Sequence, residues 1–322
     1  MTELALGIDI GGTNTVFGLI DKEGYCHNKN TLSTIAFLTP ELLIEAVKTE
    51  VDLMLDKLPN FKLVGIGIGA PNGNYFNGTI EYAPNLIWKG IIDLVKLLKV
   101  HYDLPIYVNN DANAATIGEM TYGAAKHIRD FVLVTLGTGL GSGFVSNGQL
   151  IYGHDGFGGE LGHVIIEPEG RDCGCNRKGC LETYASATGL VKTAILKLKT
   201  FEGNSTLKEM QPEELDAKTI AEAAQKQDSL AIEIFDYTAQ KLALGLANAV
   251  AITNPKTIIL YGGLAKAGDI LLKPLVKYFE SYLLEIFKNK VNIIISDLDN
   301  DNGAILGASA LVWNELKQIK RS

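Results

Sequence analysis

Short apolar runs that end in glycine-containing turns alternate along the chain with longer stretches in which apolar residues recur every three or four positions. The runs have the length of buried strands, and the longer stretches have the period of amphipathic helices. This alternation predicts an α/β protein with largely parallel or mixed sheets. Strands are expected at residues 4–10, 16–21, 63–69, 106–108, 131–136, 257–261 and 291–296, and helices at 39–58, 91–101, 114–122, 231–252, 270–288 and 303–318.

Two of these helices have clear end signals. Thr39 is suited to cap the first long helix, and Pro40 is suited to its first turn. The helix that ends at residue 252 is followed by Asn254 and Pro255, a pair that stops helices. Residues 201–217 are polar and irregular, and they predict a surface excursion between helices.

One arrangement of strands and turns occurs twice. The strand at 4–10 leads through Gly11-Gly12-Thr13 into a second strand. About 125 residues later, the strand at 131–136 leads through Gly137–Gly143 into another strand and an Asn147-Gly148 turn. The repetition predicts two similar α/β halves, each offering one glycine-rich loop to a shared cleft. Because short apolar strands with glycine turns are common, a chance likeness is the alternative.

Length and charge narrow the class of protein. The chain has 322 residues, which is about the length of two average domains. Its 29 basic and 37 acidic residues give a formal net charge of −8, so binding to nucleic acid or to an anionic membrane through bulk charge is not expected. No apolar run approaches the ~20 residues of a membrane span. An acid stands near the start, where a secretory signal would carry a base, and we expect a cytoplasmic enzyme.

Three glycine turns follow expected strands and could bind a nucleotide. Backbone N–H groups at Gly11 and Gly12 can converge on an anion, Thr13 adds a hydroxyl, and Asp9 could hold a magnesium ion. The run from Gly137 offers a second phosphate cradle, and a later Gly-Gly pair could admit an adenine ring. Ordinary turns are the alternative at each place. The P-loop motif and the dinucleotide-binding fingerprint are both absent from the sequence.

One histidine and three cysteines have the spacing of a metal site. His163, Cys173, Cys175 and Cys180 form the pattern H-x9-C-x-C-x4-C. Three thiolates and one imidazole complete a tetrahedral zinc set that leaves no position for water, so the metal would be structural. Three reduced cysteines without a metal are the alternative.

Carboxylates and amides near these motifs could bind and activate a polyol. Asp111, after Asn110 at a strand end, could take the proton from a hydroxyl that attacks a phosphoryl group, although the pair could also simply cap the next helix. Glu160 and Glu182 flank the expected metal ligands. A metal would place both on one rigid loop, where they could bind neighbouring hydroxyls, whereas without that role they would be solvated surface acids.

Taken together, the motifs resemble the ROK family of sugar kinases and repressors. They occur in that family's order and spread over nearly the whole chain. The resemblance implies an actin-like (ribonuclease H-like) two-domain sugar kinase fold with a central cleft. The motifs are D-I-G-G-T-N from residue 9, N-D-A-N-A-A from 110, L-G-T-G-L-G-S-G from 136, G-G-E-L-G-H from 158, C-G-C-N-R-K-G-C-L-E from 173 and Y-G-G from 261.

The resemblance also implies roles for individual residues. Asp111 would be the general base, and His163 would serve both the zinc and the sugar. The sugar would contact Asn85, Asn110, Asp111, Glu160, His163 and Glu182, and the zinc would bind His163, Cys173, Cys175 and Cys180. ATP and Mg²⁺ would bind Asp9, Gly11, Gly12, Thr13, Asn14, Gly137, Thr138, Gly139, Gly262 and Gly263.

The expected domains are a small one at 1–117, to which a C-terminal helix at 303–322 returns, and a large one at 118–302 that carries the zinc loop. A homodimer or higher homo-oligomer is expected. Asn176 replaces the family's usual glycine, and because asparagine tolerates left-handed backbone we expect the metal site to persist. A-P-N-G at 70–73 departs from the usual A-P-G, which leaves the outer sugar contacts open.

These observations predict an ATP- and magnesium-dependent kinase for the 6-hydroxyl of a hexose, with glucose as the first choice and a place in glycolysis. Kinases of an N-acetylhexosamine, mannose or fructose are alternatives. A sugar-responsive repressor is the rival class. We do not favour it, because the first phosphate loop begins at residue 9 and leaves no room before it for a DNA-binding helix-turn-helix.

Overall fold

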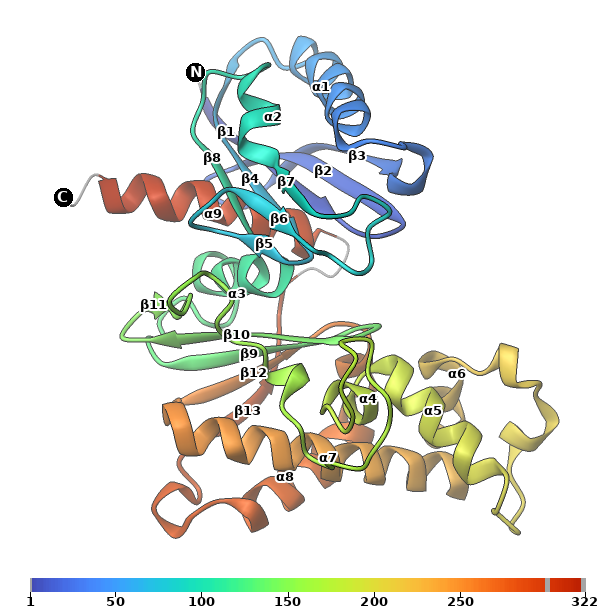
Figure 1. The fold of residues 1–322 in the computed structure, drawn as a ribbon. Helices are drawn as coiled ribbons and strands as arrows, with labels where there is room; N and C mark the ends of the chain where they lie inside the picture. The colour runs from blue at the N-terminus through green and yellow to red at the C-terminus, as the bar shows by residue number, and fades with distance from the viewer. Residues whose placement is uncertain (1, 299–301, 320–322) are drawn as a thin grey trace. The chain divides into compact units, whose positions relative to one another are not determined.

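A computed structural model describes residues 2–298 and 302–319, with side chains described through Lys317. The chain forms two compact α/β units (Figure 1). The first unit comprises residues 1–128, 150–159 and 297–322, and the second comprises residues 129–149 and 160–296.

The first unit is built on a five-stranded sheet. Its β1 strand pairs antiparallel with β2 and parallel with β4, and β4 pairs parallel with β8. In spatial order the strands are β3 (Cys26–Ser33), β2 (Asn14–Asp21), β1 (Thr2–Ile10), β4 (Phe61–Ala70) and β8 (Ile106–Asn110).

Alternation along β1 sends side chains to both faces of this sheet. Leu4, Leu6 and Ile8 are fully buried in the core that includes the apolar face of α1 (Pro40–Asp56). The other face is covered at very short range by α9 (Gly303–Ile319), because a Cβ on Gly67 of β4 would lie 1.9 Å from a backbone oxygen of that helix. The α9 helix also packs on α3 (Asp111–Thr121).

The first unit also contains a smaller antiparallel sheet, which the sequence did not predict. The prediction of a helix at 91–101 is wrong at its start, because Ile91–Asp93 forms strand β7 and pairs with β6. The Asp93 side chain accepts a hydrogen bond from the Lys96 backbone N–H, so it caps a helix that begins only at the next residue. The elements here are β5 (Gly73–Asn74), β6 (Thr79–Glu81), β7 and α2 (Leu94–Lys99).

The sheet of the second unit repeats the arrangement of the first. Here β9 pairs antiparallel with β10 and parallel with β12, and β12 pairs parallel with β13. The duplication predicted from the sequence is therefore confirmed at the level of topology. In spatial order the strands are β11 (Gln149–Leu150), β10 (Leu140–Ser146), β9 (Phe131–Leu136), β12 (Thr257–Tyr261) and β13 (Asn292–Ile295).

Helices supply most of the core of the second unit. The long α7 packs against α8 and α5 (Figure 1), and it ends where Asn254 adopts a left-handed backbone with φ of 44°. The predicted excursion at 201–217 contains two short 3₁₀ turns and the start of α6. The helices are α4 (Glu182–Ala185), α5 (Ala187–Leu198), α6 (Ala217–Gln225), α7 (Ser229–Thr253) and α8 (Asp269–Tyr282). Within the part of the chain that the structure describes, the 3₁₀ turns are η1 (Thr34–Ala36), η2 (Leu161–His163), η3 (Thr206–Glu209), η4 (Pro212–Glu214), η5 (Leu264–Ala267) and η6 (Glu285–Phe287).

The first segment of the first unit ends at residue 128, whereas the sequence predicted a domain boundary after residue 117. The α3 helix continues past that point, and the segment at 150–159 returns to the first unit. That segment is held there by the Tyr152 ring, which stacks on Tyr75 with 4.4 Å between centroids, and by a 2.8 Å hydrogen bond from Asn74 Nδ2 to the Asp155 carbonyl oxygen.

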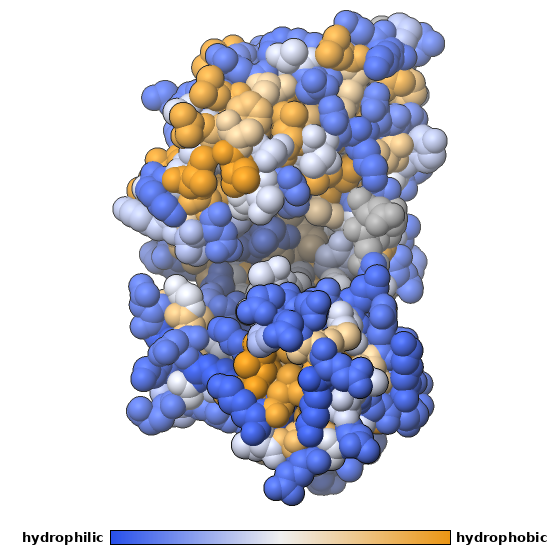
Figure 2. Space-filling model, turned by 90° about the vertical axis from the view of Figure 1, so that its right-hand side faces the viewer, coloured by the Kyte–Doolittle hydropathy of each residue, from blue (hydrophilic) through white to orange (hydrophobic). Residues whose placement is uncertain are grey.

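Some large apolar side chains are exposed on the surface, such as Leu38 at 82% and Val100 at 78%. On the face drawn in Figure 2, hydrophobic side chains lie among hydrophilic ones in both units. Across residues 2–298 and 302–319, no helix combines the length and the apolar character needed to cross a membrane.

Candidate active site

In the first unit, three parallel strands end at the same level, and the two outer ones, β1 and β8, end near polar side chains. Asp9 of β1 pairs with Gly69 of β4, and Gly69 pairs with Asn109 of β8. Asn110 and Asp111 follow directly at the start of α3. The strand register therefore brings Asp9 and Asp111, which are about a hundred residues apart in sequence, to the two sides of Gly69. A Cβ on Gly69 would lie 3.6 Å from Asp9 Oδ1 and 3.7 Å from the Asp111 Cα.

The Asn110-Asp111 pair does cap the helix, as its alternative reading predicts. Asn110 Oδ1 accepts hydrogen bonds from the backbone N–H groups of Ala112 at 2.9 Å and Asn113 at 3.4 Å. Asp111 Oδ1 accepts a bond from the same Ala112 N–H at 2.8 Å. The cap uses the oxygen of the Asn110 amide and one carboxylate oxygen of Asp111. The Asn110 NH₂ group and the second Asp111 oxygen remain chemically able to bind a hydroxyl.

The two carboxylates of this site bind protons more tightly than usual. Burial, with the nearby negative charge of Asp111, raises the pKa of Asp9 to about 7. The surrounding protein desolvates the Asp111 carboxylate and so raises its pKa, although the side chain is in part exposed. Hydrogen bonds from backbone N–H groups to the carboxylate oppose this rise. A carboxylate with a raised pKa is a stronger base once it is ionised.

The Gly11–Asn14 turn packs against the loop that carries Asn85. The Gly11 N–H donates to the Asn14 carbonyl oxygen at 2.9 Å, which closes the turn. A Cβ on Gly12 would lie 2.5 Å from the Asn85 carbonyl oxygen, so the contact requires glycine. Lys89 Nζ donates to the Leu86 carbonyl oxygen at 2.7 Å and fixes the loop. A residue predicted to bind sugar thus adjoins a turn predicted to bind phosphate.

In the second unit, two glycine turns lie side by side at the ends of β9 and β12. Thr135 pairs with Tyr261, so the turns that start at Gly137 and Gly262 are neighbours. Gly262 has a φ of 103° and needs glycine for its backbone. Gly137 and Gly263 do not: neither has a positive φ, and a Cβ on either would meet nothing within 4 Å. Neither the backbone nor the packing therefore requires glycine at Gly137 or Gly263. The open space beside these two residues could instead be filled by a ligand.

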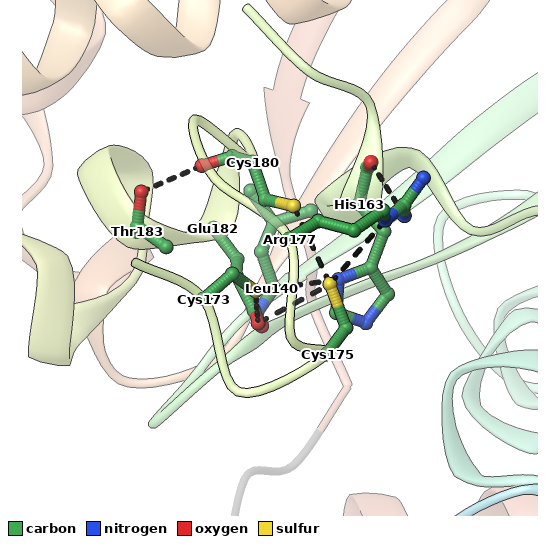
Figure 3. Close-up of polar contacts among 8 residues, drawn as sticks. All are labelled: Leu140, His163, Cys173, Cys175, Arg177, Cys180, Glu182 and Thr183. Atoms are coloured by element: carbon green, nitrogen blue, oxygen red, sulfur yellow. Dashed lines mark hydrogen bonds and ion pairs between the residues drawn. The ribbon is translucent and has the colours of Figure 1, made fainter. Parts of the chain in front are cut away.

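The four predicted metal ligands converge in the loop of residues 163–182, called the metal loop below (Figure 3). Their donor atoms all lie within 4.8 Å of one another. Cys173 Sγ is 3.7 Å from His163 Nδ1, and Cys175 Sγ is 3.6 Å from Cys180 Sγ. Donors of a tetrahedral zinc site with bonds of about 2.3 Å lie roughly 3.8 Å apart, so this cluster has the composition and size to hold zinc.

The backbone of the metal loop suits this convergence. Asn176 adopts a left-handed conformation with φ of 65°, which confirms that asparagine can replace glycine there. Arg177, which sequence reasoning missed, donates to the His163 carbonyl oxygen at 3.0 Å and to Cys175 Sγ at 3.5 Å. Although burial opposes it, this hydrogen bond lowers the pKa of Cys175 to about 6, which favours the thiolate that a metal binds. Arg177 lies between Cys175 and Cys180 in the sequence, and a basic residue at that place could have indicated a partner for a thiolate.

Glu182 links the metal loop to the first glycine turn of the same unit. Its Oε1 accepts a hydrogen bond from Cys173 Sγ at 3.1 Å and lies 3.7 Å from His163 Nδ1. Its Oε2 accepts from the Leu140 N–H at 3.4 Å (Figure 3). Glu160 is exposed and directly precedes the 3₁₀ turn that contains His163. The sequence did not indicate that Glu182 contacts the glycine turn.

The structure therefore gathers the predicted residues into two groups, one in each unit. In the first unit the strand ends bring together Asp9, Asp111 and Asn110, with Asn85 against Gly12. In the second unit the metal loop, Glu182 and the two glycine turns form one continuous set of contacts. The residues of the first group are Asp9, Gly11, Gly12, Thr13, Asn14, Asn85, Asn110 and Asp111. Those of the second are Gly137, Thr138, Gly139, Glu160, His163, Cys173, Cys175, Cys180, Glu182, Gly262 and Gly263.

Two α/β units with sheets of the same topology define the actin-like, ribonuclease H-like fold of sugar kinases. The structure is similar to that of a ROK family glucokinase from Streptomyces griseus, solved in complex with glucose and AMPPNP. The TM-score is 0.81 at 30% identity, over 97% of this chain and 99% of the other. The sequence matches the ROK family over residues 5–315, and the chain belongs to this family.

Curated relatives of the chain include both enzymes and regulators. A glucokinase of Halalkalibacterium halodurans is 36% identical over 313 residues, which are 94% of this chain and 93% of the relative. An N-acetylglucosamine repressor of Escherichia coli O157:H7 is 29% identical over 319 residues, which are 96% of this chain but 75% of the repressor.

Proposed function

We propose that this protein is an ATP-dependent hexokinase that transfers a phosphoryl group to the 6-hydroxyl of glucose. The observation that carries the proposal is the pair of carboxylates, Asp9 and Asp111, which lie on the two sides of Gly69 at the ends of β1 and β8, with the Gly11–Asn14 turn directly after Asp9 and Ile10. The likeness over nearly the full length to a glucokinase, and to a structure that binds glucose and an ATP analogue, supports the same activity.

In this proposal Asp111 is the general base. It accepts the proton of the sugar hydroxyl as that oxygen attacks the γ-phosphorus, and ADP leaves with the electrons of the broken bond. Asn110 and Asn85 hold sugar hydroxyls. Asp9 binds the magnesium ion that accompanies ATP, directly or through water, because a carboxylate oxygen is a preferred ligand of that ion.

The second unit carries the other residues to which we assign a role. The turns at Gly137–Gly139 and Gly262-Gly263 bind ATP through their backbone, and Thr138 adds a hydroxyl donor. Glu160, His163 and Glu182 contact the sugar. Chemistry of the donor set supports a structural zinc ion on His163, Cys173, Cys175 and Cys180, which would fix the orientation of the metal loop.

The preferred sugar is tested by an assay of ADP release over a panel of hexoses. The panel holds glucose, mannose, fructose and N-acetylglucosamine, each with MgATP and a blank without sugar. We expect glucose to give the highest kcat/KM. A higher kcat/KM with an N-acetylhexosamine, mannose or fructose would keep the kinase and replace the substrate. No release above the blank with any sugar would contradict the proposal.

A sugar-responsive repressor is the second candidate, because the repressor relative aligns with nearly all of this chain. The net charge of −8 disfavours it. A gel-shift experiment with operator-like DNA, with and without glucose, separates the two classes. Specific binding that glucose changes would overturn the preference for an enzyme.

We also propose that the protein acts in the cytoplasm, where ATP is supplied, as a homo-oligomer. Large apolar side chains remain exposed at the ends of α7 and α8, among them Ile252 at 84%, Leu284 at 60% and Ile286 at 63%. Burial of such residues is a common source of interface stability. Light scattering on a size-exclusion column measures the mass directly, and a monomer at micromolar concentration would contradict this part of the proposal.

A further inference from the structure

Arg171 connects the metal loop to the helices that follow it. Its backbone lies in the loop, two residues before Cys173. The Arg171 carbonyl oxygen accepts a hydrogen bond from the Gly179 N–H at 2.8 Å, so it ties together the two arms that carry the cysteines. The backbone around Gly179 is closely packed, because a Cβ on this residue would lie 1.6 Å from the Glu167 carbonyl oxygen.

The Arg171 side chain leaves the loop and binds the backbone of two helices. Nη1 donates to the carbonyl oxygen of Thr183 in α4 at 2.7 Å and to that of Gly189 in α5 at 3.0 Å. Nη2 donates to Thr193 Oγ1 at 2.9 Å. Three directed bonds from one planar group are within the reach of a guanidinium, whereas an ammonium group cannot reproduce their geometry.

Tyr184 contacts both the side chain and the backbone of Arg171. The Arg171 Cζ atom lies 4.6 Å from the centroid of the Tyr184 ring, in the range of a cation–π interaction. The Tyr184 hydroxyl accepts a hydrogen bond from the Arg171 backbone N–H at 2.9 Å. Tyr184 is 1% exposed. None of these contacts involves a metal-ligating atom, so this connection is separate from the cysteine cluster.

The helix that Arg171 binds has little stability of its own. The α4 helix has four residues, Glu182–Ala185, and an isolated helix of one turn does not persist in water. Its direction therefore depends on tertiary contacts. Thr183, whose carbonyl oxygen Arg171 holds, directly follows Glu182.

We propose that Arg171 is a positioning residue that sets the orientation of the Glu182 carboxylate toward the sugar. The inference rests on the proposed role of Glu182 as a sugar ligand. Arg171 touches neither the metal donors nor the proposed general base, so its loss weakens sugar binding more than it slows the chemical step. Loss of an interaction made equally in the ground state and the transition state raises KM and leaves kcat nearly unchanged.

The test is the substitution Arg171→Lys, which keeps the charge and removes the planar fork. We expect KM for glucose to rise about tenfold, kcat to stay within about threefold of the wild type, and metal content to stay at one equivalent. Titration calorimetry with glucose alone should show a similar loss of affinity. Thr193→Val removes the acceptor of Nη2, together with the bond that the Thr193 hydroxyl donates to the Gly189 carbonyl oxygen at 2.9 Å, and it leaves the two Nη1 bonds in place. It should give a smaller rise in KM.

Arg129→Lys is the matched control, because Arg129 lies in the same unit and donates to one carbonyl oxygen on an exposed turn, that of Asn147 at 3.0 Å. It should leave KM unchanged. An unchanged KM in Arg171→Lys overturns the inference, as does a loss of kcat at constant KM or a loss of metal that accounts for the whole effect. If Arg171→Lys cannot be purified in folded form, Thr193→Val decides, and a wild-type KM in that variant overturns the inference.

Failure of the proposed function is visible separately. A wild-type protein that phosphorylates no hexose contradicts the kinase, and glucose titration of Arg171→Lys still tests the positioning role if glucose binds. A wild-type kinase with an insensitive Arg171 contradicts only the inference.

Discussion

Asp9 and Asp111 share one electrostatic environment on the two sides of Gly69. The negative charge of Asp111 adds to the effect of burial, and together they raise the pKa of Asp9 to about 7. Two carboxylates so placed repel each other when both are ionised. A magnesium ion that accompanies ATP would remove that repulsion, so the pair favours the cation on which phosphoryl transfer depends.

The raised pKa of Asp9 predicts how stability depends on pH. The folded protein holds a proton on Asp9 up to a pH near 7, whereas the unfolded chain releases it near 3.8. The folded state therefore loses stability as pH rises through that interval. Asp9→Asn, which cannot ionise, should raise the melting temperature at pH 8 by more than about twice its effect at pH 5, measured without ATP or magnesium. Asp56→Asn, at an exposed position in α1, is the control, and equal gains at both pH values would refute the burial of a charged Asp9.

Loss of the proposed general base should affect turnover more than binding. Asp111→Asn keeps the size of the side chain and the acceptor for the Ala112 N–H, but it cannot take a proton. We expect kcat to fall by about 10²–10⁴-fold while the dissociation constant for glucose changes little. Initial rates and calorimetry measure the two quantities. A variant that keeps more than about a tenth of the wild-type kcat would exclude Asp111 as the base.

The glycine turn at Gly137 allows a test of nucleotide binding that spares the fold. A Cβ there meets nothing within 4 Å, so Gly137→Ala should melt within about 2 °C of the wild type. If the turn cradles phosphates, the added methyl group should raise KM for ATP several-fold and leave KM for glucose nearly unchanged. Unchanged kinetics for ATP would show that the turn does not contact the nucleotide.

The metal loop predicts one equivalent of zinc per chain. Cys180→Ser should lower the metal content and the melting temperature, because the loop loses a ligand that folding brings into place. Cys26→Ser is the matched control, since Cys26 is the one cysteine outside the cluster. Elemental analysis and thermal melting check both variants. Active wild-type protein with well under one equivalent would contradict the zinc assignment.

Sequence patterns located the strands that position the site, because buried strands and glycine turns have local signals. The Thr39 cap, the stop at Asn254 and the left-handed Asn176 all follow from the conformational preferences of single residues. The edge strand Cys26–Ser33 was missed, because it is rich in polar residues and has no apolar face to reveal it.

Long-range contacts account for the rest of what was missed. The segment at 150–159 joins the first unit through a ring stack with Tyr75, which no local pattern specifies. Charged loop residues such as Arg171 and Arg177 look solvated in a sequence, and only the folded backbone brings carbonyl oxygens to their side chains. The contact of Glu182 with Leu140 likewise joins segments about forty residues apart.

The identity of the product tests the central claim most directly. Phosphorus NMR of a reaction with glucose, MgATP and purified wild-type protein should show equal amounts of ADP and glucose 6-phosphate formed at the expense of ATP. Formation of ADP and inorganic phosphate without a sugar phosphate, or of a sugar phosphate at another hydroxyl, would contradict the account.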